Sequence, residues 1–183
     1  MVEVRLHPTP ILGTDTTRGQ TRVRARNDLR LWSFALPQGA EPAVAAALKD
    51  DFGLDWPSPV QSSGSTPVRA LLTQPDQVLL ILEDPADPAI PDLGPAYRTD
   101  LSDGHVVLEI EGPDVDAALE RLSPIDVSLH AFPEGAYART LMEHVPVTTL
   151  RTGHDRFLLV AARSYAASVE HAVLASLDNV LAT

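Results

Sequence analysis

Apolar positions recur along the chain with two periods, every second residue in some segments and every third or fourth residue in others. The first period is typical of strands and the second of helices. In the first half, the pattern predicts an extended segment from Arg22 to Leu36, a helix that begins near Glu41-Pro42 and ends at Gly53, and strands at Val68–Thr73 and Gln77–Leu82. Proline favours the first turn of a helix and glycine the position past its end, so this helix carries both boundary signals.

The second half repeats this order and adds a final helix. The predicted elements are a strand at His105–Glu111, a helix between Gly112-Pro113 and Pro124, one or two strands within Ala138–Leu150, a strand at Phe157–Ala161 and a helix at Ser164–Leu181. Ser164 is the expected N-cap of the last helix, because a serine hydroxyl there accepts a bond from a free backbone N–H.

Short sequence matches relate the two halves to each other. Ala46-Ala47-Leu48 matches Ala117-Ala118-Leu119, and Leu54-Asp55 matches Ile125-Asp126 at the same offset of 71 residues. One such unit cannot bury its sheet face and its helix alone, whereas two units packed together can. We therefore predict an α+β fold built by internal duplication of two strand-helix-strand-strand halves.

The prediction treats residues 1–183 as a single domain. Residues 1–20 contain several turn-forming residues and are predicted to be an irregular N-terminal arm. The two pseudo-repeats are placed at about 22–83 and 96–183, on either side of the proline-rich segment 84–95.

The composition excludes several classes of protein. The chain has no cysteine, which excludes disulfides, thiolate metal ligands and a cysteine nucleophile. No apolar run approaches the roughly 20 residues of a membrane span, and the N-terminus lacks the apolar core of a secretory signal. We expect a cytoplasmic protein with no membrane contact.

The charge distribution argues against nucleic acid as a partner and draws attention to one arginine-rich stretch. The net charge is −11, which would repel a phosphate backbone. Arg22, Arg24 and Arg26 alternate with small apolar residues, so an extended backbone places them on one face. This face is either a solvated strand surface or an arm that docks on an acidic partner.

A search for catalytic motifs finds none. No two glycines lie within four residues of each other, which excludes a dinucleotide-binding loop and a Walker loop, and no G-x-S-x-G elbow occurs. The six histidines show no metal-ligand spacing. Asp55 and Asp126, at the repeat position, are either turn carboxylates or ligand-binding remnants. The sequence predicts no catalytic, cofactor-binding or metal-binding residue, and Ile125 to Thr140 is interpreted as a scaffold and contact segment.

An ordered set of short motifs carries a family resemblance over roughly Leu101 to Leu177. The motifs are Glu111-Gly112-Pro113, Pro124-Ile125-Asp126, Phe132-Pro133-Glu134-Gly135, Ala138-Arg139-Thr140, Phe157 and Arg163-Ser164-Tyr165. In order and spacing they resemble the gamma subunit of heterotetrameric sarcosine oxidase. That family is similar in fold to the folate-binding domain of the glycine-cleavage T-protein.

The resemblance implies a non-catalytic structural subunit. The implied complex oxidises sarcosine to glycine and passes the methyl carbon to tetrahydrofolate. Its alpha subunit is expected to bind NAD and folate, its beta subunit FAD and FMN, and its delta subunit zinc, with no cofactor on the gamma subunit. The candidate contacts with these partners are Arg22, Arg24, Arg26, Arg139, Arg163 and Tyr165.

Two alternatives stay open at this point. The chain is alternatively a gamma-like subunit of a related N-methyl amino acid or betaine demethylase. It is otherwise a stand-alone folate-binding protein of the T-protein-like group, in which Asp126 or Asp55 would face a pterin.

Overall fold

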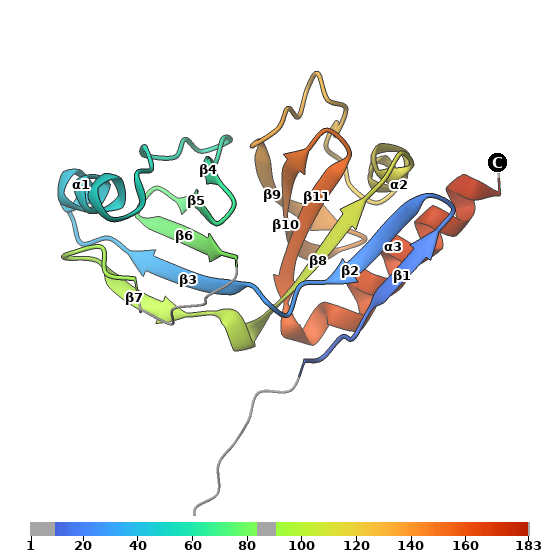
Figure 1. Ribbon diagram of the computed structural model, residues 1–183, viewed down its shortest axis with the longest axis horizontal. Coiled ribbons are helices and arrows are strands. Elements are labelled where there is room, and N and C mark those ends of the chain that lie inside the picture. Colours follow the sequence, from blue (N-terminus) through green and yellow to red (C-terminus); the bar gives the residue numbers. More distant parts are fainter. Residues whose placement is uncertain (1–9, 84–90, 183) are drawn as a thin grey trace, which may run out of the picture.

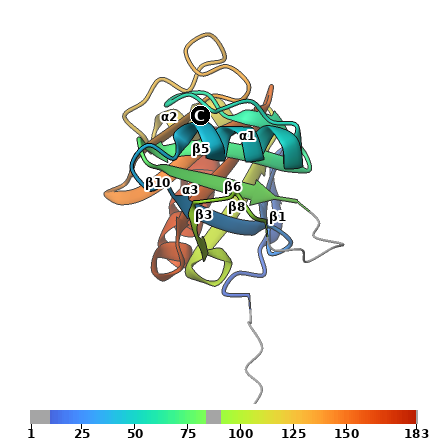
Figure 2. The ribbon, with the colours of Figure 1, turned by 90° about the vertical axis from the view of Figure 1, so that its left-hand side faces the viewer.

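Two antiparallel sheets form the centre of the molecule, and helices cover their outer faces (Figure 1). The computed structural model describes residues 10–83 and 91–182. The larger sheet has the order β1-β2-β8-β11-β10-β9, and the smaller sheet has the order β4-β5-β6-β3-β7. Figure 2 shows α1 in front of the smaller sheet, on the side away from the larger one.

The strands and helices have the following bounds. The larger sheet consists of β1 (Asp15–Arg18), β2 (Thr21–Ala25), β8 (His105–Glu111), β9 (Tyr137–Met142), β10 (Val145–Gly153) and β11 (Arg156–Ala162). The smaller sheet consists of β3 (Arg30–Ala35), β4 (Ser63–Ser65), β5 (Val68–Gln74), β6 (Gln77–Leu82) and β7 (Tyr97–Asp100). The helices are α1 (Glu41–Phe52), α2 (Val115–Glu120) and α3 (Ala166–Leu181), with short 3-10 turns η1 (Ser102–Gly104) and η2 (Arg163–Tyr165).

The predicted duplication is visible in the topology. β3-α1-β4-β5-β6 and β8-α2-β9-β10-β11 have the same chain order, and in each unit the first strand pairs with the last. The two equivalent hairpins share an irregular register, between Leu72 and Gln74 in one and between Arg151 and Gly153 in the other. The α+β duplicated fold is therefore confirmed.

The two units also exchange strands with each other. The β1-β2 hairpin precedes the first unit in sequence but pairs with β8 of the second. β7 follows the first unit across the 84–95 segment and returns to pair with β3. The extended segment predicted from Arg22 to Leu36 is consequently two strands in different sheets. The arm predicted at residues 1–20 is wrong for Asp15–Arg18, which is an edge strand without an apolar face, while residues 1–9 lie outside the described residues.

Both faces of the central strands are buried, which explains their continuous apolar runs. In β11, Phe157 and Leu159 pack toward α2 and α3, whereas Leu158 and Val160 pack against the smaller sheet. A third cluster lies between α1 and the outer face of the smaller sheet. A leucine buried in this way contributes about 1.5–3 kcal/mol, so the sheet–sheet layer holds the two units together.

Tyr137 of β9 ties the two units through its hydroxyl group. The oxygen lies 2.7 Å from the Leu72 carbonyl and 2.9 Å from the Ser58 carbonyl, both in the first unit. Burial raises the pKa of the phenol. The neutral, hydrogen-bonded form therefore belongs to the folded state.

We expect Tyr137→Phe to lower the free energy of unfolding by about 1–2 kcal/mol at neutral pH, because a buried carbonyl loses its donor. Since the folded pKa lies above the ordinary value of 10.0, the phenol's contribution is complete below pH 10 and is lost as the pH rises past it. Urea unfolding at pH 7 and pH 11 measures both effects. A difference between the two proteins that does not narrow at the higher pH would contradict this role.

Candidate functional site

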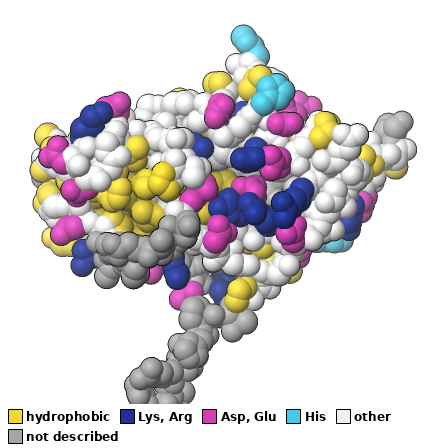
Figure 3. All heavy atoms as spheres, viewed as in Figure 1, with side chains coloured by type: hydrophobic (Ala, Val, Ile, Leu, Met, Phe, Trp, Pro, Cys, Tyr) yellow, Lys and Arg dark blue, Asp and Glu magenta, His cyan; other side chains and the backbone are white. Residues whose placement is uncertain are grey.

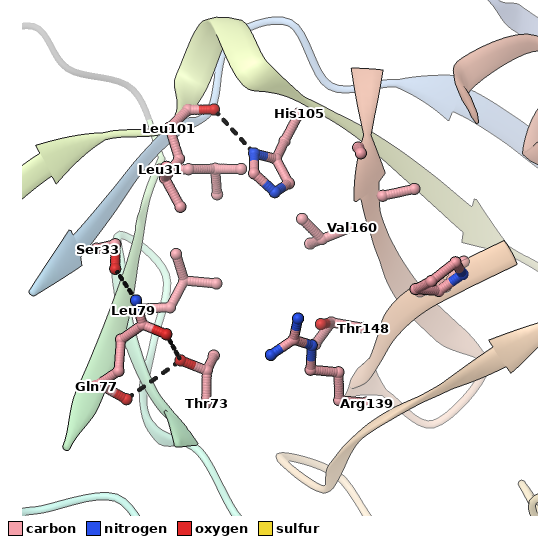
Figure 4. A pocket seen from close by; sticks show the side chains of 14 residues that line it. Leu31, Ser33, Thr73, Gln77, Leu79, Leu101, His105, Arg139, Thr148 and Val160 are labelled. Carbon is pink, nitrogen blue, oxygen red and sulfur yellow. Dashed lines mark hydrogen bonds between the residues drawn. The ribbon is translucent and has the colours of Figure 1, made fainter. Parts of the chain in front are cut away.

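A pocket of about 180 Å³ lies between the two sheets. Figure 4 shows its two walls, one carrying Ser33, Thr73 and Gln77 of the smaller sheet and the other carrying Arg139 and Thr148 of the larger sheet. Leu31, Leu79, Leu101 and Val160 contribute apolar surface between them. The duplicated fold thus creates a shared pocket that neither unit forms alone.

The polar side chains of the first wall form hydrogen bonds within that wall. The Gln77 amide donates to the Ser33 hydroxyl at 2.8 Å, and the Thr73 hydroxyl donates to the Gln77 backbone carbonyl at 3.2 Å. At the rim, His105 Nδ1 lies 3.2 Å from the Leu101 carbonyl. An imidazole protonated at Nδ1 satisfies this contact and leaves Nε2 as an acceptor.

Arg139 gives the pocket a cation. It projects from β9 toward Thr148 (Figure 4), and its side chain is exposed. Within residues 10–83 and 91–182, no carboxylate pairs with it. A guanidinium of this kind binds a carboxylate or phosphate group but neither attacks a substrate nor transfers a proton at neutral pH.

The predicted arginine face exists, but its charges are paired inside the chain. Arg22 forms two hydrogen bonds to Asp15, at 2.8 and 2.7 Å. Arg24 and Arg26 bind the two oxygens of Glu109 at 2.5 and 2.6 Å. Each of the three charges therefore has a carboxylate partner within the chain.

Arg26 is the most enclosed of the three arginines. Its side chain is 7% exposed and also pairs with Asp28 at 2.7 Å and Glu83 at 3.3 Å. The bond from this guanidinium holds the pKa of Asp28 below its ordinary value. A role in partner contacts stays a prediction for Arg22, Arg24 and Arg26. In such a contact, each arginine would have to bind a partner's acid in addition to the acid of this chain that it already binds.

The other two candidate contacts lie on η2, at the start of the last helix. Tyr165 is 43% exposed, and Arg163 lines a second hollow together with Pro10 and Ile11. Their contact role also stays a prediction. The expected N-cap at Ser164 is wrong, because the 3-10 turn shifts the start of α3 and places Tyr165 at the cap without a side-chain bond.

The two repeat-position aspartates lie outside the pocket. Asp126 accepts a bond from the Ser128 backbone N–H at 2.9 Å, and the Ser128 side chain together with this backbone N–H lowers the pKa of the carboxyl group. Asp55 pairs with Lys49 at 2.8 Å. Both side chains are exposed, and neither lines the pocket between the sheets. Their geometry is that of turn and surface carboxylates.

Sequence reasoning missed Arg151, which holds the Ile125–Thr140 stretch in place. The side chain is completely buried, bonds Asp116 at 2.8 Å, and also donates to the carbonyls of Val127 and His154. Its guanidinium carbon lies 4.3 Å from the Phe157 ring centre. The sequence feature that could have indicated a buried arginine is its position directly after the apolar run that ends at Leu150.

Comparison with known proteins places the chain in a family. A model described as the sarcosine oxidase, gamma subunit family matches residues 37–173. The chain belongs to this family. The resemblance read from the motifs is therefore confirmed.

A curated member of the gamma family is similar over most of its length. It is the sarcosine oxidase subunit gamma of Corynebacterium sp. (strain P-1), which is 29% identical over 181 residues that cover 93% of this chain and 87% of the relative.

Solved structures support the T-protein-like fold. Heterotetrameric sarcosine oxidase from Corynebacterium sp. U-96, in complex with pyrrole 2-carboxylate, contains a chain with a TM-score of 0.78, 22% identity and coverage of 90% of this chain and 87% of that one. The glycine cleavage system aminomethyltransferase T from Bartonella henselae gives a TM-score of 0.59 at 14% identity, with coverage of 86% of this chain and 46% of that one.

Two further observations bear on the kind of site. Across the described residues, histidine, aspartate and glutamate form no cluster of three that would hold a metal ion. None of the helices in these residues is long and apolar enough to cross a membrane.

Proposed function

We propose that this chain is a non-catalytic structural subunit of a heterotetrameric sarcosine oxidase. The complex would demethylate sarcosine oxidatively to glycine and transfer the methyl carbon to tetrahydrofolate. The observation that carries the proposal is the gamma-family match over residues 37–173. The solved relative of similar fold is itself described as a heterotetrameric sarcosine oxidase.

The lining of the pocket supports a structural role. Arg139 and His105 are the ionisable side chains in its lining. The other lining residues have hydroxyl, amide or apolar side chains. This set lacks the pair of carboxylates or the activated nucleophile that general acid–base or covalent catalysis uses.

The proposed partners are the alpha, beta and delta subunits. NAD and tetrahydrofolate would lie on alpha, FAD and FMN on beta, and zinc on delta. The two candidate pterin carboxylates, Asp55 and Asp126, are exposed and lie outside the pocket. Neither aspartate can therefore hold a pterin in this pocket, which disfavours the stand-alone folate-binding alternative.

Co-expression with alpha, beta and delta subunits tests the proposal. Purification through a tag on this chain is expected to recover a yellow complex that contains flavin and consumes oxygen with sarcosine. A colourless monomer that binds tetrahydrofolate in calorimetry would contradict the proposal and support the folate-binding alternative.

The substrate preference of the same complex tests the remaining alternative, a related demethylase. We expect kcat/KM to be higher for sarcosine than for other N-methyl amino acids or betaines. A complex that assembles but prefers one of those substrates would assign the chain to a related demethylase.

A further inference from the structure

A charged groove of about 320 Å³ lies apart from the pocket of Figure 4, between the smaller sheet and the β2-β8-β11 side of the larger one. Figure 3 shows charged side chains of both signs gathered near the middle of the visible face. Four arginines reach the groove: Arg24, Arg26, Arg69 and Arg156. Three of them, Arg24, Arg26 and Arg156, form an ion pair with a carboxylate of the same chain.

Those three ion pairs form the fixed part of the groove wall. Arg24 and Arg26 share the two oxygens of Glu109, and Arg156 pairs with Glu111. In this groove, guanidinium groups therefore bind carboxylates. Each of these arginines is neutralised by an acid of the same chain.

Arg69 is the exception. The residue is 6% exposed and lies on β5, where its Nη1 donates to the Gly64 carbonyl at 3.2 Å. Its Nε is buried without a partner, and no carboxylate of the described residues lies within 4.0 Å of the guanidinium. Burial lowers the pKa of this guanidinium, and the more distant charges of Glu83 and Glu134 offset that effect only in part.

A desolvated cation without a counter-ion is unfavourable in the free chain. Residues that are perturbed in this way and face a surface groove are candidates for binding sites. The guanidinium has a planar set of donors that matches a carboxylate. The missing component is therefore one carboxylate group.

We propose that the groove at Arg69 receives an acidic side chain of a partner subunit, which completes the ion pair that the free chain lacks. The inference rests on the proposed function, since it requires an assembled complex. The groove is open on the surface and has wall residues from both units, so a protruding aspartate or glutamate can reach the guanidinium.

The stability of the chain alone gives the first test. We expect Arg69→Met to leave the melting temperature unchanged or to raise it, because the substitution removes an uncompensated buried charge. Arg26→Met is the matched control, because Arg26 is equally buried in the same groove but fully paired. It should lower the melting temperature by several degrees. An equal loss in both variants would make Arg69 an ordinary structural residue and overturn the proposal.

Assembly with the other subunits gives the second test. Arg69→Met should weaken binding to the rest of the complex by about tenfold or more, Arg69→Lys should weaken it less, and Arg121→Met, at an exposed position, should not change it. Dissociation constants from titration of the tagged chain provide the measurement.

The outcomes separate this inference from the proposed function. Failure of the unmodified chain to assemble contradicts the proposed function. Unchanged assembly of Arg69→Met, in a complex that the unmodified chain forms, overturns only the role of Arg69. Saturable stabilisation by inorganic phosphate below about 1 mM, absent in Arg69→Met, would assign the groove to a free anion instead.

Discussion

Arg151→Met is expected to lower the free energy of unfolding by about 3–5 kcal/mol. The guanidinium donates to the buried Val127 carbonyl, and nearer the surface to the His154 carbonyl and to Asp116. Methionine fills similar space but donates nothing, so the buried Val127 carbonyl loses its donor, and Asp116 loses its cation. Urea or thermal unfolding followed by circular dichroism measures the loss.

Arg121→Met is the control for Arg151→Met. Arg121 follows α2 and is exposed, so its replacement should change the stability by less than about 0.5 kcal/mol. If Arg151→Met and Arg121→Met unfold at the same urea concentration, the network around Arg151 does not stabilise the fold as described.

Gly112→Ala is expected to lower the free energy of unfolding by about 2–4 kcal/mol. Gly112 follows β8 with a φ of 145°, which disfavours a side chain. A Cβ there would lie 2.5 Å from Thr21 Cα and 2.7 Å from the Gln20 carbonyl oxygen, both backbone atoms of the β1-β2 turn. The backbone must shift, and the hairpin must move away from β8.

Gly104→Ala provides the matched comparison. A Cβ at Gly104 meets no atom within 4 Å and its φ lies outside the left-handed region, so we expect a change below about 0.5 kcal/mol. Near-equal thermal unfolding of the two alanine variants would show that the hairpin accommodates the extra atom without cost.

The sequence predicted best those elements whose signals are local or whose burial is complete. α1 spans Glu41–Phe52, as the proline and glycine signals indicate, and Gly53 ends it with a left-handed φ of 68°. β6 and β11 are apolar on both faces, β8 is apolar apart from Glu109 and its two ends, and all three were found with nearly correct bounds. The apolar content of these segments is enough to predict where the strands lie.

Edge strands were missed for the opposite reason. β1 (Asp-Thr-Thr-Arg), β4 (Ser-Gly-Ser) and β7 (Tyr-Arg-Thr-Asp) carry few apolar side chains and pair on one side only. Their strand conformation depends on a neighbour far away in sequence. No local pattern of hydrophobicity encodes such a dependence.

The candidate contact residues show the same division. Alternation placed Arg22 and Arg24 on one face correctly, because the period of a strand is a local property. The partner of Arg24 could not be predicted, since Glu109 lies on β8 and reaches this arginine only through the strand exchange. Arg69 went unnoticed because a single arginine in a strand has no sequence signal that tells whether a carboxylate will face it.

The strand exchange restricts how this protein can have changed since its duplication. If the chain is divided between the two units, the first fragment keeps the β1-β2 hairpin that completes the sheet of the second, and the second keeps the β7 that completes the sheet of the first. Each fragment would expose an unpaired strand edge that invites aggregation. Each copy therefore protects a strand edge of the other, and selection for a soluble product would keep the two copies on one chain.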